Sequence, residues 1–331
     1  MSEKSNRRSF IQAFGTAAAG TAGAAAVTNG SSRPSLAQAP GSLPFTAESL
    51  SKAGRSFINP DKVLLWENTR KEIRELLEGG QLKAAILPTG SIEQHNEHMA
   101  MVADVANATL ISQQAALQLF PQVIVAPPSP CGYAPYHMAR KGTITLRKET
   151  FQAYVFDVME SLKAHGIRTI LVLNGHGGNH QPLQEALPEW RTKLGINIDA
   201  DSYWSGTPQS ELKTFVRSKQ LTSHAGEFET SIYKAAFPGR LRPFTMEEYD
   251  DAKLNYESDF SPEVEEFLRR DRRSFKDGEI DLAGENGRDR RRQEEALLAH
   301  EKTGEIILTR AINFVVDKMQ TMIAATEADK S

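Results

Sequence analysis

Between residues 84 and 203, short apolar runs alternate with longer amphipathic segments, and this alternation narrows the choice of fold more than any other feature. The run at 169–173 is rich in β-branched residues and Leu and has no polar alternation, which is typical of a strand covered on both faces. Strands that alternate with helices indicate a mostly parallel sheet with helices on both faces. We therefore predict an α/β fold.

The apolar spacing also places the individual elements. It predicts strands at 84–87, 123–126, 143–146, 169–173 and 197–203, and helices at 66–77, 104–120, 151–165, 181–194 and 304–325. Pro188 should disturb the fourth of these helices, because proline has no backbone N–H. The last helix repeats its apolar residues at the helical period, so we expect it to belong to the core.

The composition is that of a globular protein of enzyme size. Of the 331 residues, 40% are hydrophobic and 24% charged, which excludes a collagen-like, coiled-coil or low-complexity chain. The single cysteine, Cys131, cannot form an intramolecular disulfide. The net charge of -3 gives no support to a nucleic-acid-binding protein or to a protein bound to an anionic membrane, since both need a basic surface.

The N-terminus resembles a twin-arginine secretion signal. Arg7 and Arg8 precede an uncharged Ala/Gly-rich stretch at 13–27, and residues 37–39 read Ala-Gln-Ala, an A-x-A cleavage site. The uncharged stretch is shorter than the roughly 20 apolar residues of a membrane span. The alternative interpretation is a disordered, low-complexity N-terminus, and the ordered signal pattern favours the signal peptide, which we assign to residues 1–39.

Removal of residues 1–39 would change the net charge to -6, because that segment holds four basic residues and one acidic residue. The twin-arginine route exports proteins that are already folded, often around a cofactor. The resemblance therefore implies a periplasmic protein that uses the twin-arginine export machinery and has no stable membrane association. Residues 40–331 should form a single domain.

Within that domain, residues 250–300 are dense in charge, and a run of Asp and three Arg begins at Asp289. One hypothesis is a phosphate-binding or partner-binding loop. We favour the other, a solvated insertion of mixed charge at the edge of the domain.

Three loops concentrate the residue types that bind metals. In the first, Glu93 and His95 are two positions apart, so an extended chain projects both to one side, and Asp104 can approach from the start of the next helix. The second loop contains His176 beyond the carboxyl end of a predicted strand, where ligands bind in open α/β sheets. The third opens a short helix at His224. Such a mixed oxygen and nitrogen donor set suits a divalent ion such as Zn or Mn.

A single His or Glu after a strand is more often solvated or hydrogen-bonded than a ligand, but the clustering of histidines favours a metal site. Five of the eight histidines fall in these loops: His95, His98, His176, His180 and His224. Two other kinds of site lack their patterns. Gly175-x-Gly177 has no third glycine of a dinucleotide fingerprint, and there is no G-x-S-x-G elbow of a serine hydrolase.

The three loops form ordered motifs. These are Pro88-x-Gly90-Ser91-x-Glu93-Gln94-His95-x-x-His98 with Asp104, then Asn174-Gly175-His176-Gly177-Gly178-Asn179, then His224-Ala225-Gly226-x-x-Glu229-Thr230-Ser231. They resemble the creatininase family of metal-dependent amidohydrolases, over about residues 84–238. The resemblance implies a three-layer α/β/α sandwich around a mostly parallel sheet, which agrees with the alternation above, and a homo-oligomer such as a hexamer.

The resemblance also implies a two-metal centre that contains zinc or manganese, with iron as a further possibility. Glu93, Asp104 and His176 would hold one ion. The other would be held by His95, Asp104 and Glu229, so that Asp104 bridges the pair. Two such ions lower the pKa of a shared water and polarise an amide carbonyl.

Further residues are implied around that centre. His224 matches the acid that protonates the departing nitrogen, and Glu227, one helical turn away, would orient its imidazole unless it is a surface glutamate. Trp204 is either a wall of the pocket or a core residue. The residues expected to bind substrate are Tyr133, His137, Gly142, Thr143, Gly177 and Trp204.

Two departures from the family pattern bear on the substrate. Creatinine-hydrolysing members carry a carboxylate two residues after the metal-binding histidine of the second motif, where this chain has Gly178. They also carry a tryptophan before the third motif, where residues 220–223 include no aromatic side chain. The sequence therefore argues against creatinine.

We predict a divalent-metal hydrolase that cleaves a C–N amide bond of a small molecule, a cyclic amide or a formamide. One alternative is a metal-dependent hydrolase of another bond, such as that of a strained cyclic ketone or a short peptide. The other is a periplasmic protein that binds a metal or solute without catalysis.

Overall fold

The computed structural model of the chain describes residues 60–246, 259–276 and 288–329. The predicted signal peptide at 1–39 lies outside these residues. Within them the strands form one parallel sheet of order β2-β1-β3-β4. The strands are β1 (Ala84–Thr89), β2 (Val123–Val125), β3 (Thr169–Asn174) and β4 (Asn197–Ser202).

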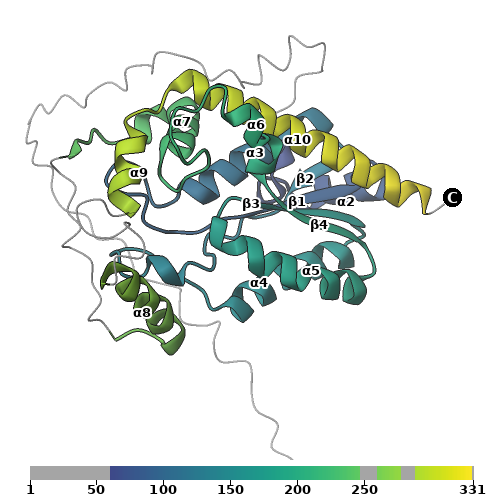
Figure 1. Ribbon diagram of the computed structural model, residues 1–331. Coiled ribbons are helices and arrows are strands. Elements are labelled where there is room, and N and C mark those ends of the chain that lie inside the picture. The colour runs from purple at the N-terminus through teal and green to yellow at the C-terminus, as the bar shows by residue number, and fades with distance from the viewer. Residues whose placement is uncertain (1–59, 247–258, 277–287, 330–331) are drawn as a thin grey trace, which may run out of the picture. The chain divides into compact units, whose positions relative to one another are not determined.

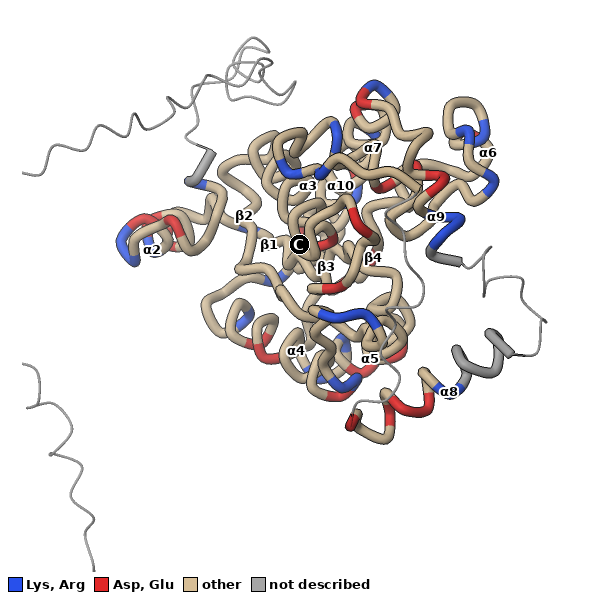
Figure 2. The backbone as a smooth tube through the Cα atoms, turned by 90° about the vertical axis from the view of Figure 1, so that its left-hand side faces the viewer, with Lys and Arg blue, Asp and Glu red and all other residues tan. Residues whose placement is uncertain are grey.

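Helices cover both faces of this sheet, as the end-on view in Figure 2 shows. One face carries α3 (Ala103–Leu119), α7 (Glu227–Ala236) and α10 (Glu301–Ala328), and the other carries α4 (Lys148–Ala164) and α5 (His180–Leu194). The remaining helices are α2 (Arg70–Glu78), α6 (Gln209–Leu212), α8 (Pro262–Lys276) and α9 (Arg288–Ala296). The predicted α/β/α sandwich with a parallel sheet is confirmed.

The two faces of the sheet bury two separate hydrophobic cores. On β1, Ile86 packs with residues of α3 and α10, whereas its neighbour Leu87 packs with residues of α4 and α5. On β3, Leu171 and Val172 divide in the same way. Both strands are buried along their whole length, which explains why their sequences show no polar alternation.

Helix α10 is a core helix, as its apolar period predicts. Ile307, Ala311, Val315 and Met319 are almost completely buried against the sheet and its neighbouring helices. Gly304 lets α10 cross α7 closely, because a Cβ atom at this position would overlap the carbonyl group of Ser231. No helix in the described part of the chain has both the length and the apolar composition to cross a membrane.

Two details differ from the sequence predictions. The segment 143–146 forms isolated bridges, Ile144 with Ile92 and Thr145 with Gly132, instead of a strand of the sheet. Pro188 lies inside α5, and the helix continues to Leu194. Burial of Leu187, Trp190 and Leu194 on one helical face compensates for the backbone hydrogen bond that the proline cannot donate.

Candidate active site

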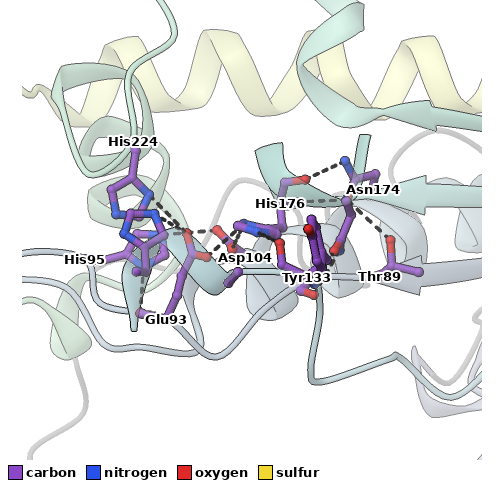
Figure 3. Close-up of polar contacts among 12 residues, drawn as sticks. Thr89, Glu93, His95, Asp104, Tyr133, Asn174, His176 and His224 are labelled. Atoms are coloured by element: carbon purple, nitrogen blue, oxygen red, sulfur yellow. Dashed lines mark hydrogen bonds and ion pairs between the residues drawn. The ribbon is translucent and has the colours of Figure 1, made fainter. Parts of the chain in front are cut away.

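The predicted metal ligands meet beyond the carboxyl ends of the two central strands. Glu93 and His95 follow β1, and His176 follows β3, which is the direct neighbour of β1. Asp104 lies in the first turn of α3, and Glu229 lies in the first turn of α7. Figure 3 shows Glu93 and Asp104 between His95 and His224 on one side and His176 on the other. The topology therefore brings together all five residues that the family resemblance implies as metal ligands.

A tight turn after β3 holds His176 in place. The backbone N–H of His176 donates to Asn174 Oδ1 at 3.0 Å, and the side-chain amide of Asn174 donates to the carbonyl oxygen of His176 at 2.7 Å. Gly175 faces α3, where a Cβ atom would overlap the carbonyl oxygen of Asp104. The glycine thus allows the turn to approach the helix that carries the shared carboxylate.

The first donor set consists of Glu93, Asp104 and His176, all of them buried. His176 Nδ1 lies 2.9 Å from Glu93 Oε2 and 3.1 Å from Asp104 Oδ2. Neither of these two oxygens accepts a hydrogen bond of good geometry within the described residues. Two carboxylate oxygens and one imidazole nitrogen that converge in this way fit a divalent ion.

The second donor set consists of His95, Asp104 and Glu229. His95 Nε2 lies 3.1 Å from Asp104 Oδ1 and 3.6 Å from Glu229 Oε2. The other ring nitrogen, Nδ1, donates to the carbonyl oxygen of Glu93 at 3.1 Å, which leaves Nε2 as the metal-binding atom. Asp104 presents Oδ2 to the first set and Oδ1 to the second, the arrangement required of a bridging carboxylate.

The buried carboxylates of this cluster are stabilised by positive charge close to them. Burial raises the pKa of Glu93, and it raises that of Glu229 to about 7. Burial by itself lowers the pKa of His95, but the carboxylates of Asp104 and Glu229 outweigh it and raise the pKa to about 10. Protons on the imidazoles compensate the buried carboxylates in the metal-free protein. A bound divalent ion would supply that charge instead and would take the imidazoles as neutral ligands.

His224 stands at the edge of both donor sets. Its Nε2–H donates to the carbonyl oxygen of Gln94 at 2.7 Å, and its Nδ1 lies 3.2 Å from Glu93 Oε1. Burial lowers its pKa well below the usual range, and the positive charges of His95 and His137 lower it further. His224 is therefore neutral at rest. Its Nδ1 also forms a third group of possible ligands with Glu93 and His95, so the geometry allows either role, ligand or proton carrier.

Glu227 does not orient His224, contrary to the prediction. Its carboxylate is buried, and Oε2 accepts hydrogen bonds from the backbone N–H groups of Arg217 at 2.8 Å and Ser218 at 2.5 Å. The helical spacing on which the prediction relied does not apply, because α7 begins at Glu227 and His224 precedes it. Glu227 instead fixes the chain before the third motif.

A cavity of about 290 Å³ opens onto the donor sets and His224. Three of the predicted substrate-binding residues line it, namely His137, Gly177 and Trp204. His137 Nε2 lies 3.6 Å from Glu93 Oε1, and its ring stacks on that of His224 at 4.5 Å. The other residues of the wall are Tyr136, Thr222, Phe228 and Arg292.

The remaining predicted substrate-binding residues support the site without lining this cavity. Thr143 Oγ1 accepts a hydrogen bond from the backbone of Gln94 at 3.2 Å. The carbonyl oxygen of Tyr133 lies 3.1 Å from His176 Nε2, which fixes the ring of that ligand. Gly142 is exposed, and its φ of +95° makes it a turn residue. Thr143 and Tyr133 thus contact residues of the site, and none of these three residues is among those that line the cavity.

Tyr136 is a site residue that the sequence analysis missed. Its hydroxyl group lies 3.1 Å from His176 Nε2 and lines the cavity. A Cβ atom on Gly178 would overlap that hydroxyl group and the carbonyl oxygen of Tyr133. The phenol therefore occupies the space beside Gly178, where creatinine-hydrolysing members carry a carboxylate. The sequence signal for this role is the position of Tyr136 directly before His137, three residues after Tyr133.

The charged segment is only partly a solvated insertion. Gln293 of α9 is buried and accepts a hydrogen bond at 3.3 Å from the backbone of Glu97, in the first motif. Glu295 accepts a hydrogen bond from Ser223 at 3.0 Å, next to the third motif. For α9 the favoured interpretation was therefore wrong, because one face of this helix packs on the motif loops.

Comparison with known proteins agrees with this architecture. A family model described as Creatininase: Creatinine amidohydrolase matches residues 66–319. The chain is 30% identical over 184 residues to the 3-dehydro-scyllo-inosose hydrolase of Thermotoga maritima, covering 54% of this chain and 58% of that protein. It is 29% identical over 192 residues to the creatinine amidohydrolase of Pseudomonas putida, covering 53% and 72%. A mycofactocin precursor peptide peptidase of Mycobacterium ulcerans is 28% identical over 154 residues, covering 44% and 56%.

Solved structures share the fold. A manganese form of creatininase superposes with a TM-score of 0.60 at 22% identity and covers 78% of this chain and 98% of its own. A Zn–Zn form of a creatininase variant gives a TM-score of 0.59, also at 22% identity, over 78% and 97%. At this level of identity the structures establish the common architecture.

Proposed function

Because the chain belongs to the creatininase family, we propose that it is a hydrolase that uses two divalent metal ions to cleave a C–N amide bond of a small molecule, a cyclic amide or a formamide. One observation carries the proposal. Asp104 offers one carboxylate oxygen to each of two buried donor sets, and each set also contains one imidazole and one further carboxylate. Zinc and manganese are the proposed ions, since both accept mixed nitrogen and oxygen ligands.

The donor sets support this chemistry. Two divalent ions bound there would lower the pKa of a shared water and polarise the carbonyl group of the amide. The Nε2–H of His224 is held by the carbonyl oxygen of Gln94, so Nδ1 is the nitrogen that faces the donor sets. Its Nδ1 is the atom that takes up a proton from the attacking water and passes it to the departing nitrogen. The sequence prediction of an acid is thus refined to a residue that becomes an acid only during the reaction.

The surrounding residues keep the ligands in position. His176 Nε2 faces the carbonyl oxygen of Tyr133 and the hydroxyl group of Tyr136, each at 3.1 Å, so that Nδ1 is left for the metal. His95 is fixed in the opposite sense, with Nδ1–H on the carbonyl oxygen of Glu93. These contacts hold both imidazoles in the tautomer that a metal needs.

The size of the cavity supports a small substrate. Its volume of about 290 Å³ is close to the lower limit of about 300 Å³ for small-molecule sites. The hydroxyl group of Tyr136 beside Gly178 argues against creatinine. Similarity to an inosose hydrolase and to a peptidase supports a second candidate, the hydrolysis of a cyclic ketone or a short peptide at the same metal centre.

Metal analysis followed by a substrate screen tests the proposal. Protein purified from the periplasm should contain about two equivalents of zinc or manganese and should open the ring of at least one cyclic amide, or release formate from a formamide. Fewer than one equivalent of tightly bound divalent metal would contradict the metal centre. Full metal content without turnover on amides, cyclic ketones or short peptides would instead support the metal- or solute-binding alternative.

The location and assembly of the protein are also proposals. The twin-arginine pattern in residues 1–39 supports export in the folded state to the periplasm. Family membership supports a homo-oligomer such as a hexamer. Cell fractionation of the full chain, with and without Arg7→Lys and Arg8→Lys together, tests the first proposal. Sedimentation analysis of the mature protein tests the second.

A further inference from the structure

Arg292 places a positive charge on the wall of the catalytic cavity, and the proposed reaction does not use it. Arg292 is the only Lys or Arg among the described residues that line the cavity. The same cavity is lined by Glu93, Asp104 and His176 of the first donor set, so the guanidinium group and the metal-binding residues face one shared space.

The position of Arg292 is fixed by its neighbours on α9. Gln293 is completely buried, accepts a hydrogen bond from the backbone of Glu97 and lies 3.4 Å from His98 Nδ1 through its amide nitrogen. Glu295 is bonded to Ser223, and Ala296 is completely buried. The helix is therefore attached to the first and third motifs by the residues that directly follow the arginine. These contacts fix the backbone of Arg292 beside the cavity, which lowers the entropic cost of binding a ligand there.

Two aromatic side chains line the same cavity as Arg292 and the metal-binding residues. Phe228 is almost completely buried, and Trp204 is half-buried, so both present apolar surface to the cavity. A substrate bound with its amide at the donor sets can place its apolar body against these rings. Its other end can then reach the guanidinium group.

We propose that Arg292 binds a carboxylate group of the substrate, so that the natural substrate is a small amide that also carries a carboxylate. This inference rests on the proposed function and names its substrate class. A guanidinium group pairs with a carboxylate through two parallel N–H···O bonds, which fix orientation as well as charge. A single arginine suits one carboxylate, and the volume of about 290 Å³ suits a short amide acid.

A pair of metal-directed probes tests this substrate class. Monohydroxamates of malonic, succinic, glutaric and adipic acid carry a metal-binding head and a carboxylate at increasing distance. The neutral controls are the acyl hydroxamates of the same chain length. Calorimetry on the zinc-loaded protein should show at least one acidic probe that binds about tenfold more tightly than its neutral control, which is a typical gain for one charge-assisted pair.

Substitutions assign that preference to Arg292. In Arg292→Gln the acidic and neutral probes should bind equally, while the affinity for the neutral probe stays unchanged. Arg292→Lys should retain part of the preference. Arg290→Gln is the matched control, because Arg290 lies on the same helix and pairs with Glu294 at the surface, 3.6 Å away. This variant should keep the full preference.

The outcomes separate the two proposals. Equal affinity of wild-type protein for acidic and neutral probes at every chain length would overturn the carboxylate inference and leave the metal centre intact. The same holds if Arg292→Gln keeps the preference, or if it weakens both kinds of probe equally, since the arginine would then only balance the buried carboxylates. If no hydroxamate binds the zinc-loaded protein at all, the proposed function fails, and this inference fails with it.

Discussion

The floor and the outer wall of the cavity are built in different ways. The floor is the set of five donor residues, Glu93, His95, Asp104, His176 and Glu229, which follow the ends of neighbouring strands or begin helices at that edge of the sheet. The outer wall, namely Tyr136, Trp204 and Arg292, comes from segments that are not part of the motifs. The floor supports the general chemistry of a metal hydrolase. The wall supplies the contacts that distinguish one substrate from another.

The largest effect is expected from a change in the floor. Glu93→Ala removes a buried carboxylate from the first donor set, so the protein should lose bound metal and its turnover should fall by at least about 1,000-fold. Elemental analysis and a turnover assay check this. Glu189→Ala, which alters an exposed residue paired with Lys193, is the control and should change neither quantity. Retention of full metal content in Glu93→Ala would remove Glu93 from the floor.

The next prediction concerns His224, which stands where the floor and the wall meet. His224→Ala should lower kcat by about 100-fold to 10,000-fold, the usual contribution of a proton-transferring side chain, and should leave the metal content unchanged. The exposed His180 offers the control variant His180→Ala. A loss of metal in His224→Ala would show that its Nδ1 serves as a ligand, as the third donor group allows.

Two adjacent glycines test how tightly the wall packs on the floor. Gly178→Ala would push a methyl group into Tyr136 and the carbonyl oxygen of Tyr133, so we expect a loss of about 1 to 3 kcal/mol in the free energy of unfolding. Gly177→Ala should stay within about 0.5 kcal/mol of the original protein, because no atom lies within 4 Å of the added Cβ. Denaturant unfolding measures both. Equal stabilities of the two variants would show that Tyr136 and Tyr133 can move to make room for the added methyl group.

The last prediction concerns His98, which links the first motif to α9 and affects stability only at acidic pH. Its Nε2 lies 2.8 Å from Thr230 Oγ1, and burial lowers its pKa to about 4, below the ordinary value of 6.5. The unfolded chain then binds a proton more readily than the folded protein between these two pH values. Stability should therefore fall as the pH decreases from 6.5 to 4, by about 2 to 3 kcal/mol from this group.

His98→Gln should make that decrease smaller by the same amount, which urea unfolding at several pH values measures. An unchanged pH dependence in the variant would mean that His98 does not limit acid stability. It would also weaken the description of α9 as a part of the protein that is firmly attached to the floor.

The sequence predicted the floor well and the wall poorly. Residue spacing placed Glu93, His95 and Asp104 together and His176 beyond the end of a strand next to β1. The full donor set came from the resemblance of the three motifs to the creatininase family. The role of Arg292 in the wall was not predicted, because it lies in a charged segment whose composition is typical of a solvated surface. Glu227 was misassigned because helical spacing was applied across the start of α7.

The sequence alone therefore determined the parallel α/β architecture, because the apolar period of strands and helices is a short-range pattern. Its three motifs indicated the donor residues through their resemblance to the creatininase family. Only the tertiary structure decided that Tyr136 fills the space beside Gly178, that Glu227 holds the loop at Arg217, and that Arg292 faces the cavity. These contacts join segments far apart in the chain. They depend on how side chains from distant segments pack together, which the spacing of residues along the sequence does not predict.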